Sequence, residues 1–250
     1  MSAGLALALL ASSLAGAVCP RPVYLTIDTG HMGVAPLVAE VLQRHQVPAT
    51  FFLASEPTQT GGHSLDAEWA PWWRARAAEG HDFGSHTWAH DIWQADVPGG
   101  FRFKTRAGQQ KPSWRTLTAA GYCTELKRPA QAFKAMTGRD MAPVFRAPGG
   151  KTSPALLAAA KACGYTHVGW TPNGFLGDEL SSERFPNDQL LKQALARVKE
   201  GDVLLMHLGI WSRREAWAPA VLEPLITGLK AKGLCFAPLR AHPDYQGRMR

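Results

Sequence analysis

Short apolar runs and amphipathic stretches alternate along most of this chain. The apolar runs predict strands at 22–28, 49–55, 81–86, 142–148, 165–170, 202–207 and 234–239. The amphipathic stretches predict helices at 34–42, 65–78, 113–136, 154–163, 187–200 and 215–232. Such alternation predicts a mostly parallel sheet flanked by helices, either open or closed into a barrel.

The segment 91–112 interrupts this alternation, because it combines five glycine and proline residues with four basic side chains. Its composition predicts a long loop, and long loops in compact domains are often functional. Two interpretations of its basic part, residues 102–115, stay open. It is either a solvated loop or a binding surface for an anionic glycan.

The N-terminus predicts export. Residues 3–18 are uncharged and rich in alanine and leucine, but the run is short for a membrane span. Ala15-Gly16-Ala17 fits the small-x-small pattern of a signal cleavage site. We expect residues 1–17 to be a signal peptide and residues 18–250 to be a single domain of a periplasmic or secreted protein. A lipoprotein signal and a misplaced start are the alternatives.

The cysteine count predicts disulfides, and the net charge limits the kinds of binding partner that we expect. Four cysteines in an exported chain predict two disulfides with three possible connectivities, of which the element order favours Cys19–Cys235 and Cys123–Cys163. The net charge of +7 suits an anionic envelope or an acidic polymer. No block of five basic residues occurs, so nucleic-acid binding is not expected, and neither is stable membrane insertion.

Four polar residues lie at the ends of predicted strands: Asp28, His86, Arg146 and His207. In α/β folds this end of the strands carries the active site. His86 and His90 have the i, i+4 spacing that would place both imidazoles on one face of a helical turn, where one metal ion fits. The glutamate of the H-E-x-x-H motif is missing, so a metalloprotease of that type is disfavoured.

Each of these residues also has a purely structural interpretation. Asp28 is either a turn residue or a third metal ligand or general base. Arg146 is either a surface ion-pair partner or the group that keeps Asp28 ionised. His207 is either a core histidine or a general acid, and the His86–His90 pair is either capping or metal-binding.

Taken in order, the motifs resemble those of the NodB-homology polysaccharide deacetylases, carbohydrate esterase family four. The motifs are TIDTG (26–30), HTWAH (86–90), RAP (146–148) and LMH (205–207). The resemblance covers roughly residues 22–240 and implies a distorted (β/α) barrel. It also implies a metal-dependent hydrolase that removes N-acetyl groups from an N-acetylated polysaccharide or a peptidoglycan-type glycan.

The resemblance also implies roles for individual residues. Asp28 would take a proton from the attacking water, and Arg146 would orient Asp28. The backbone N–H of Gly149 would help to stabilise the oxyanion, and His207 would protonate the leaving amine. The implied cofactor is a divalent metal ion, with zinc as the first choice, held by His86 and His90.

Two positions depart from the family pattern. Thr29 stands where the family has the aspartate that completes the metal site. Three interpretations follow: His31 supplies the third ligand, or waters complete the pair of histidines, or the site holds no metal. In the fourth motif, Asn173 stands where the family has the aspartate that pairs with the catalytic histidine, and Asp178 follows further along.

Tryptophans beside the motifs are candidates to stack on sugar rings, namely Trp88, Trp93, Trp170 and Trp211. A carbohydrate polymer is therefore the expected partner. Two rival functions stay open: an O-acetyl esterase on the same scaffold, and a non-catalytic carbohydrate-binding protein, which the threonine at position 29 favours.

Overall fold

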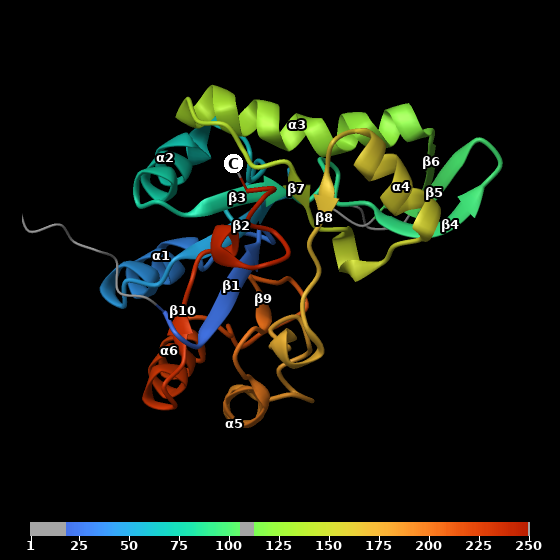
Figure 1. The fold of residues 1–250 in the computed structure, drawn as a ribbon. Coiled ribbons are helices and arrows are strands. Elements are labelled where there is room, and N and C mark those ends of the chain that lie inside the picture. Colours follow the sequence, from blue (N-terminus) through green and yellow to red (C-terminus); the bar gives the residue numbers. More distant parts are fainter. Residues whose placement is uncertain (1–18, 106–112, 250) are drawn as a thin grey trace, which may run out of the picture.

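The computed structural model describes residues 19–105 and 113–249, and a parallel sheet of seven strands forms its centre (Figure 1). The strand order is β10–β1–β2–β3–β7–β8, and β9 also pairs with β1. The strands are β1 (Pro22–Asp28), β2 (Ala49–Leu53), β3 (Asp82–Ser85), β7 (Val144–Phe145), β8 (Thr166–His167), β9 (Val203–His207) and β10 (Cys235–Phe236). The predicted parallel α/β architecture is therefore confirmed.

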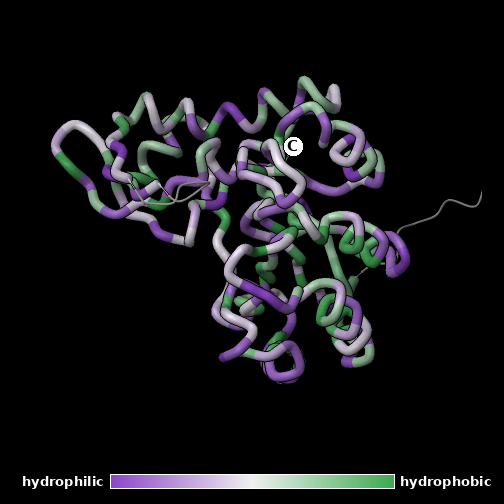
Figure 2. Tube along the Cα trace, turned by 180° about the vertical axis from the view of Figure 1, so that it is seen from behind, coloured by the Kyte–Doolittle hydropathy of each residue, from purple (hydrophilic) through white to green (hydrophobic). Residues whose placement is uncertain are grey.

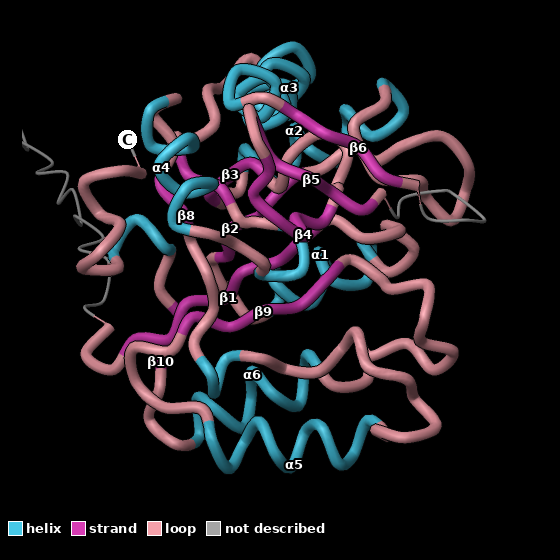
Figure 3. Tube along the Cα trace, turned by 90° about the vertical axis from the view of Figure 1, so that its right-hand side faces the viewer, coloured by secondary structure: helices cyan, strands magenta, loops and turns pink. Residues whose placement is uncertain are grey.

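Helices follow the strands along the chain and cover the sheet. They are α1 (Ala35–Arg44), α2 (Ala70–Ala78), α3 (Ala119–Thr137), α4 (Pro154–Ala162), α5 (Asn187–Arg197) and α6 (Leu222–Ala231). Figures 1 and 3 show α2 and α3 on one side of the sheet and α5 and α6 on the opposite side.

The central strands are apolar because both of their faces are covered. Ile27 of β1, Phe51 of β2 and Leu204 of β9 are each at most 1% exposed and belong to one large core with residues of α1 and α6. Figure 2 shows hydrophobic residues along the inner strands and mainly hydrophilic residues along α5 at the bottom of the view. The core thus fixes the strands whose ends carry the polar residues.

The predicted loop at 91–112 is wrong for most of its described part, residues 91–105. A second, antiparallel sheet forms there from β4 (Ile92–Val97), β5 (Gly100–Lys104) and β6 (Trp114–Leu117). Residues 106–112 lie outside the described part of the chain.

The alternation within β5 explains this sheet. Phe101 and Phe103 are buried, whereas Arg102 between them is exposed. This is the period of two that a half-buried strand requires, and the glycines and prolines around it hide the pattern. The helix predicted from residue 113 consequently begins later: Thr118 is the N-cap of α3, and its hydroxyl accepts a hydrogen bond from the Gly121 N–H at 3.1 Å.

Both expected disulfides are present. Cys19–Cys235 ties the chain ahead of β1 to β10, and Cys123–Cys163 ties α3 to the residue that ends α4. The predicted signal peptide, residues 1–17, lies outside the described residues. Across the described chain, no helix combines the length and the apolar character that crossing a membrane would need.

Candidate active site

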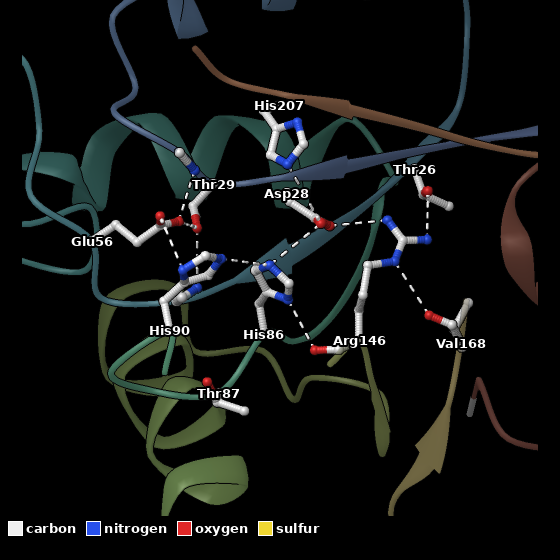
Figure 4. A network of polar contacts seen from close by, with 12 residues as sticks. Thr26, Asp28, Thr29, Glu56, His86, Thr87, His90, Arg146, Val168 and His207 are labelled. Carbon is white, nitrogen blue, oxygen red and sulfur yellow. Dashed lines mark hydrogen bonds and ion pairs between the residues drawn. The ribbon is translucent and has the colours of Figure 1, made fainter. Parts of the chain in front are cut away.

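The carboxyl ends of neighbouring strands bring Asp28, His86, Arg146 and His207 together (Figure 4). Asp28 and His207 are direct partners in the register between β1 and β9. The backbone N–H of Arg146 donates to the carbonyl of Ser85, one residue before His86. Because these strands are parallel, their last residues share one rim, as expected from the sequence.

Asp28 lies at the centre of the rim and is 2% exposed. Arg146 Nη1 donates to its Oδ1 at 3.0 Å, and Oδ2 lies 3.4 Å from Nε2 of His86 and 4.0 Å from Nε2 of His207. Burial by itself would raise the pKa of Asp28, but Arg146 and the two imidazoles outweigh it and lower that pKa. The carboxylate is therefore ionised near neutral pH.

Arg146 is fully buried and is held by several acceptors. Nη2 donates to Thr26 Oγ1 at 2.7 Å and Nε donates to the Val168 carbonyl at 3.2 Å. A guanidinium stays charged in proteins, and its planar fork fixes the direction of each donor. The orientation of the Asp28 carboxylate is thus fixed by the arginine beside it.

His86 and His90 meet in a loop between β3 and β4, and the predicted helical turn is wrong. Thr87 and His90 have positive φ angles of 61° and 54°, so the chain turns sharply between the two imidazoles. Their Nε2 atoms lie 3.1 Å apart, and Nδ1 of His86 donates to the Arg146 carbonyl at 2.9 Å. Burial lowers the pKa of His86 to about 4, so this imidazole is neutral near pH 7.

Glu56, which follows β2, was missed by the sequence analysis. Its Oε2 accepts hydrogen bonds from Thr29 Oγ1 at 2.5 Å and from the Gly30 N–H at 2.8 Å, and its Oε1 lies 3.7 Å from His90 Nδ1. Burial would raise the pKa of Glu56, but the two histidines and the Thr29 hydroxyl lower it. A signal was present, since Glu56 stands three positions after the buried strand β2, near the same end of the sheet as Asp28, the last residue of β1.

Asp178, not Asn173, is the partner of His207. Its two carboxylate oxygens lie 3.1 and 3.2 Å from Nδ1 of His207, and Oδ2 also accepts from the backbone N–H of His207 at 2.6 Å. Burial by itself would lower the pKa of His207, but Asp178 raises it to about 9. The carboxylate that is absent at position 173 is therefore supplied by Asp178, five positions later in the chain.

His31 lies beside the rim, next to Trp211. The His31 Nδ1 accepts a hydrogen bond from the Gly33 N–H at 3.0 Å, and the ring packs edge-on against Trp211 with the centroids 5.0 Å apart. His31 and His207 both line a small pocket next to the rim. The Trp211 side chain is 66% exposed and available to a large ligand.

The other predicted contact residues differ in their surroundings. Trp170 lies near Arg146, with its ring centroid 5.6 Å from the guanidinium carbon. Gly149 has a φ of 63°, which favours glycine. Trp88 packs against the main core, with the guanidinium of Arg128 4.0 Å over its ring. The ring of Trp88 is therefore covered by a charged side chain, unlike that of the exposed Trp211.

The two histidines fit a metal ion. Two nitrogens bound to one tetrahedral zinc lie about 3.3 Å apart, close to the 3.1 Å between the Nε2 atoms of His86 and His90. Because Nδ1 of His86 is a donor, its Nε2 carries a lone pair that faces His90. In residues 19–105 and 113–249, no group of three or more His, Cys, Asp or Glu side chains forms a complete metal-binding set. A third protein ligand therefore requires a side chain to move toward the pair.

Comparisons with known proteins agree with this geometry. A family model described as polysaccharide deacetylase matches residues 15–168. A chitooligosaccharide deacetylase from Azorhizobium caulinodans is 27% identical over 227 residues, which cover 87% of this chain and 92% of that protein.

Two solved structures share the fold at 20% identity. A family 4 acetyl xylan esterase from Clostridium thermocellum, in complex with a cobalt ion, has a TM-score of 0.69 and coverage of 91% of this chain and 93% of that one. A pseudoenzyme of carbohydrate esterase family four from Bacillus anthracis has a TM-score of 0.64 and coverage of 89% and 65%. The expected distorted (β/α) barrel is thus confirmed, and the chain belongs to the polysaccharide deacetylase family.

Proposed function

We propose that this protein is an exported, metal-dependent hydrolase that removes N-acetyl groups from an N-acetylated polysaccharide or a peptidoglycan-type glycan. The observation that carries the proposal is the convergence of Asp28, the His86–His90 pair and His207 on one rim. The similarity to a chitooligosaccharide deacetylase favours an amide substrate. The two disulfides favour an oxidising compartment, hence export.

Asp28 is the general base in this proposal. Arg146 holds Oδ1, so Oδ2 is the atom that accepts a proton from the attacking water. His86 and His90 are the side chains that would hold a divalent metal ion, for which zinc is the first choice. Such an ion, when bound, supplies a polarised acetyl carbonyl and a more acidic water.

His207 is the general acid. Asp178 occupies its Nδ1, so Nε2, 4.0 Å from Asp28 Oδ2, is the nitrogen that faces the reacting group. Its pKa of about 9 keeps the imidazole protonated near pH 7, as a donor to a leaving amine must be. The backbone N–H of Gly149 is the proposed donor to the carbonyl oxygen.

Aromatic side chains near the rim are the proposed contacts to sugar rings. Trp211 is the first choice because it is exposed, and Trp170 is the second because it lies beside Arg146. Trp88 was also predicted to contact sugar, and we rank it last because Arg128 covers its ring.

Two other functions have a specific observation in their favour. The fold shared with an acetyl xylan esterase favours an O-acetyl esterase, whose leaving alkoxide needs less help from His207 than an amine does. The threonine at position 29, together with the fold shared with a pseudoenzyme, favours a glycan-binding protein without hydrolytic activity.

One assay separates the three functions. Acetate release is measured from N-acetylglucosamine oligomers, from peptidoglycan and from O-acetylated xylan, with zinc or with a chelator. We expect zinc-dependent release from the N-acetylated substrates and loss of release in Asp28→Asn. Release from xylan alone supports the esterase, and glycan binding without release from any substrate supports the binding protein.

A further inference from the structure

Two imidazoles alone make an incomplete catalytic metal site, because such sites usually have three protein ligands and one open position. Within the described residues, the side chains with an oxygen donor near the His86–His90 pair are Asp28, Glu56 and Asp91, and Thr29 is bonded to Glu56. Asp91 is paired with Arg115 at 3.1 Å. Asp28 is already committed to Arg146 at 3.0 Å. A threonine hydroxyl has no charge to offset that of a metal ion, so Glu56 is the remaining candidate.

The carboxylate of Glu56 has few cationic groups near it, which favours a bound cation at this place. Its side chain is 15% exposed, and its ion-pair partner in the described chain is His90 at 3.7 Å. Asp28 and Asp178, the other carboxylates at the rim, have Arg146 and His207 as close partners at 3.0 and 3.1 Å. A buried carboxylate with no lysine or arginine beside it is costly unless another cation compensates it.

Local structure holds Glu56 in this place. Its backbone N–H donates to Ser64 Oγ at 3.0 Å, and the Ser64 N–H donates to the Glu56 carbonyl at 2.9 Å. The donors Thr29 Oγ1 and Gly30 N–H both bind Oε2. Oε1 accepts from neither of these donors and lies 3.7 Å from Nδ1 of His90, so the carboxylate has to turn toward the Nε2 side of that ring to reach a cation held by both histidines.

Thr29 and Glu56 act as a pair. An aspartate at position 29 would carry its carboxyl carbon on the same Cβ that carries Oγ1 of Thr29, and Oγ1 lies 2.5 Å from Glu56 Oε2. Two carboxylates would then share one place, which is unfavourable when both are ionised. A threonine instead donates a hydrogen bond to Glu56. The carboxylate beside the histidine pair therefore comes from the segment after β2 rather than from the segment after β1.

His31 is less suited to complete the site. Its Nδ1 is engaged by the Gly33 N–H, and its ring lies against Gly209, where an added Cβ would come within 2.2 Å of the ring. The ring also packs on Trp211. Moving His31 to the histidine pair would break these contacts, whereas Glu56 already lies beside the His90 ring, 3.7 Å from its Nδ1.

We propose that Glu56 is the third protein ligand of the metal centre, beside His86 and His90, and supplies the carboxylate that position 29 lacks. This proposal rests on the proposed function for the presence of a metal. It is tested by metal binding without substrate, so a failure of Glu56 as a ligand and a failure of acetate release are separate results.

The test compares zinc affinity by competition with a chromophoric chelator and by calorimetry on metal-stripped protein. Glu56→Gln keeps the shape of the side chain and removes its charge, and we expect its zinc dissociation constant to rise by more than about 100-fold, the upper end of the range for residues outside the coordination sphere. Glu40→Gln removes the same charge on the exposed side of α1 and should leave the affinity unchanged. His31→Ala should also leave it unchanged.

A compensating variant decides between a ligand and an indirect effect on His90. The double variant Thr29→Asp/Glu56→Gln returns a carboxylate to the metal from β1, and we expect it to recover at least about 10-fold of the lost affinity. Melting temperatures of the metal-free variants check folding, and Glu56→Asp, which retracts the carboxylate by one methylene, serves if Glu56→Gln does not fold.

Three results would overturn the proposal. They are wild-type affinity in Glu56→Gln, a loss of affinity in His31→Ala instead, and a double variant that binds zinc no better than Glu56→Gln. Loss in Glu56→Gln with recovery in the double variant supports it.

Discussion

Replacing Asp178 by asparagine tests how the fold keeps a proton on His207. Both oxygens of Asp178 lie within 3.2 Å of Nδ1, and this carboxylate raises the pKa of His207 to about 9 although burial opposes the shift. Asparagine preserves the shape and removes the charge. We therefore expect the pKa of His207 to fall toward its ordinary value of 6.5, because burial then opposes the weaker effects of Asp28 and Glu179.

The size of the effect follows from that shift. A fall from about 9 to 6.5 corresponds to roughly 3 kcal/mol at about 1.4 kcal/mol per pKa unit. At pH 8 about 90% of the wild-type imidazoles carry the proton, against about 3% in the variant, a difference of roughly 30-fold. At pH 5.5 most imidazoles are protonated in both proteins, so the pH-dependent part of the loss should nearly vanish there.

The assay is the pH profile of kcat/KM on N-acetylglucosamine oligomers, with Asp188→Asn on the exposed side of α5 as the charge control. The basic limb should move from about pH 9 toward pH 6.5 in Asp178→Asn and stay in place in the control. A variant whose basic limb coincides with that of the wild type would refute the assignment of His207 and Asp178 as the acid pair.

Urea unfolding of metal-free protein gives a second readout that needs no activity. Because the pKa of His207 is raised in the folded state, its contribution to the free energy of unfolding is fully present below pH 6.5 and is lost as the pH rises through about 9. The wild type should lose up to about 3 kcal/mol over that window. The Asp178→Asn variant should lose much less.

Three further perturbations have defined outcomes. Arg146→Lys keeps the charge but loses the fork that orients Asp28, so kcat should fall about 100-fold with KM little changed; an unchanged kcat in steady-state kinetics would contradict this. Opening the Cys19–Cys235 bridge as the double serine variant should lower the free energy of unfolding by about 2–5 kcal/mol in urea titrations, because the bridge spans a separation of 216 residues. Trp211→Ala should raise KM for oligomers about 10-fold while kcat changes little, and equal KM values would remove Trp211 from the sugar-binding surface.

The sequence was sufficient to predict the central sheet, because its strands are buried on both faces and therefore form continuous apolar runs in the sequence. The ends of those runs also located Asp28, Arg146 and His207 correctly, since parallel strands end on one rim. The β5 strand was missed because only Phe101 and Phe103 mark its buried face, and flanking glycine and proline residues favoured a loop.

The missed site residues were those that reach the rim from distant positions. Glu56 is 27 positions from Thr29, and Asp178 is 29 positions from His207, so no local pattern links either pair. Asp178 supplies the carboxylate that the fourth motif lacks at position 173, and Glu56 is the proposed substitute for the carboxylate missing at position 29. The motifs showed where the two carboxylates are missing, and only the packing of the segments after β2 and after residue 174 pointed to these two residues.

Acetate release by zinc-loaded wild type and by Asp28→Asn, measured on the same N-acetylglucosamine oligomers, shows whether Asp28 is the general base of a metal-dependent deacetylase. Asparagine preserves the packing against Arg146 but cannot accept a proton, so we expect zinc-dependent turnover by the wild type and a loss of about 100-fold or more in the variant, with zinc affinity retained. Equal rates of acetate release from both proteins would contradict it.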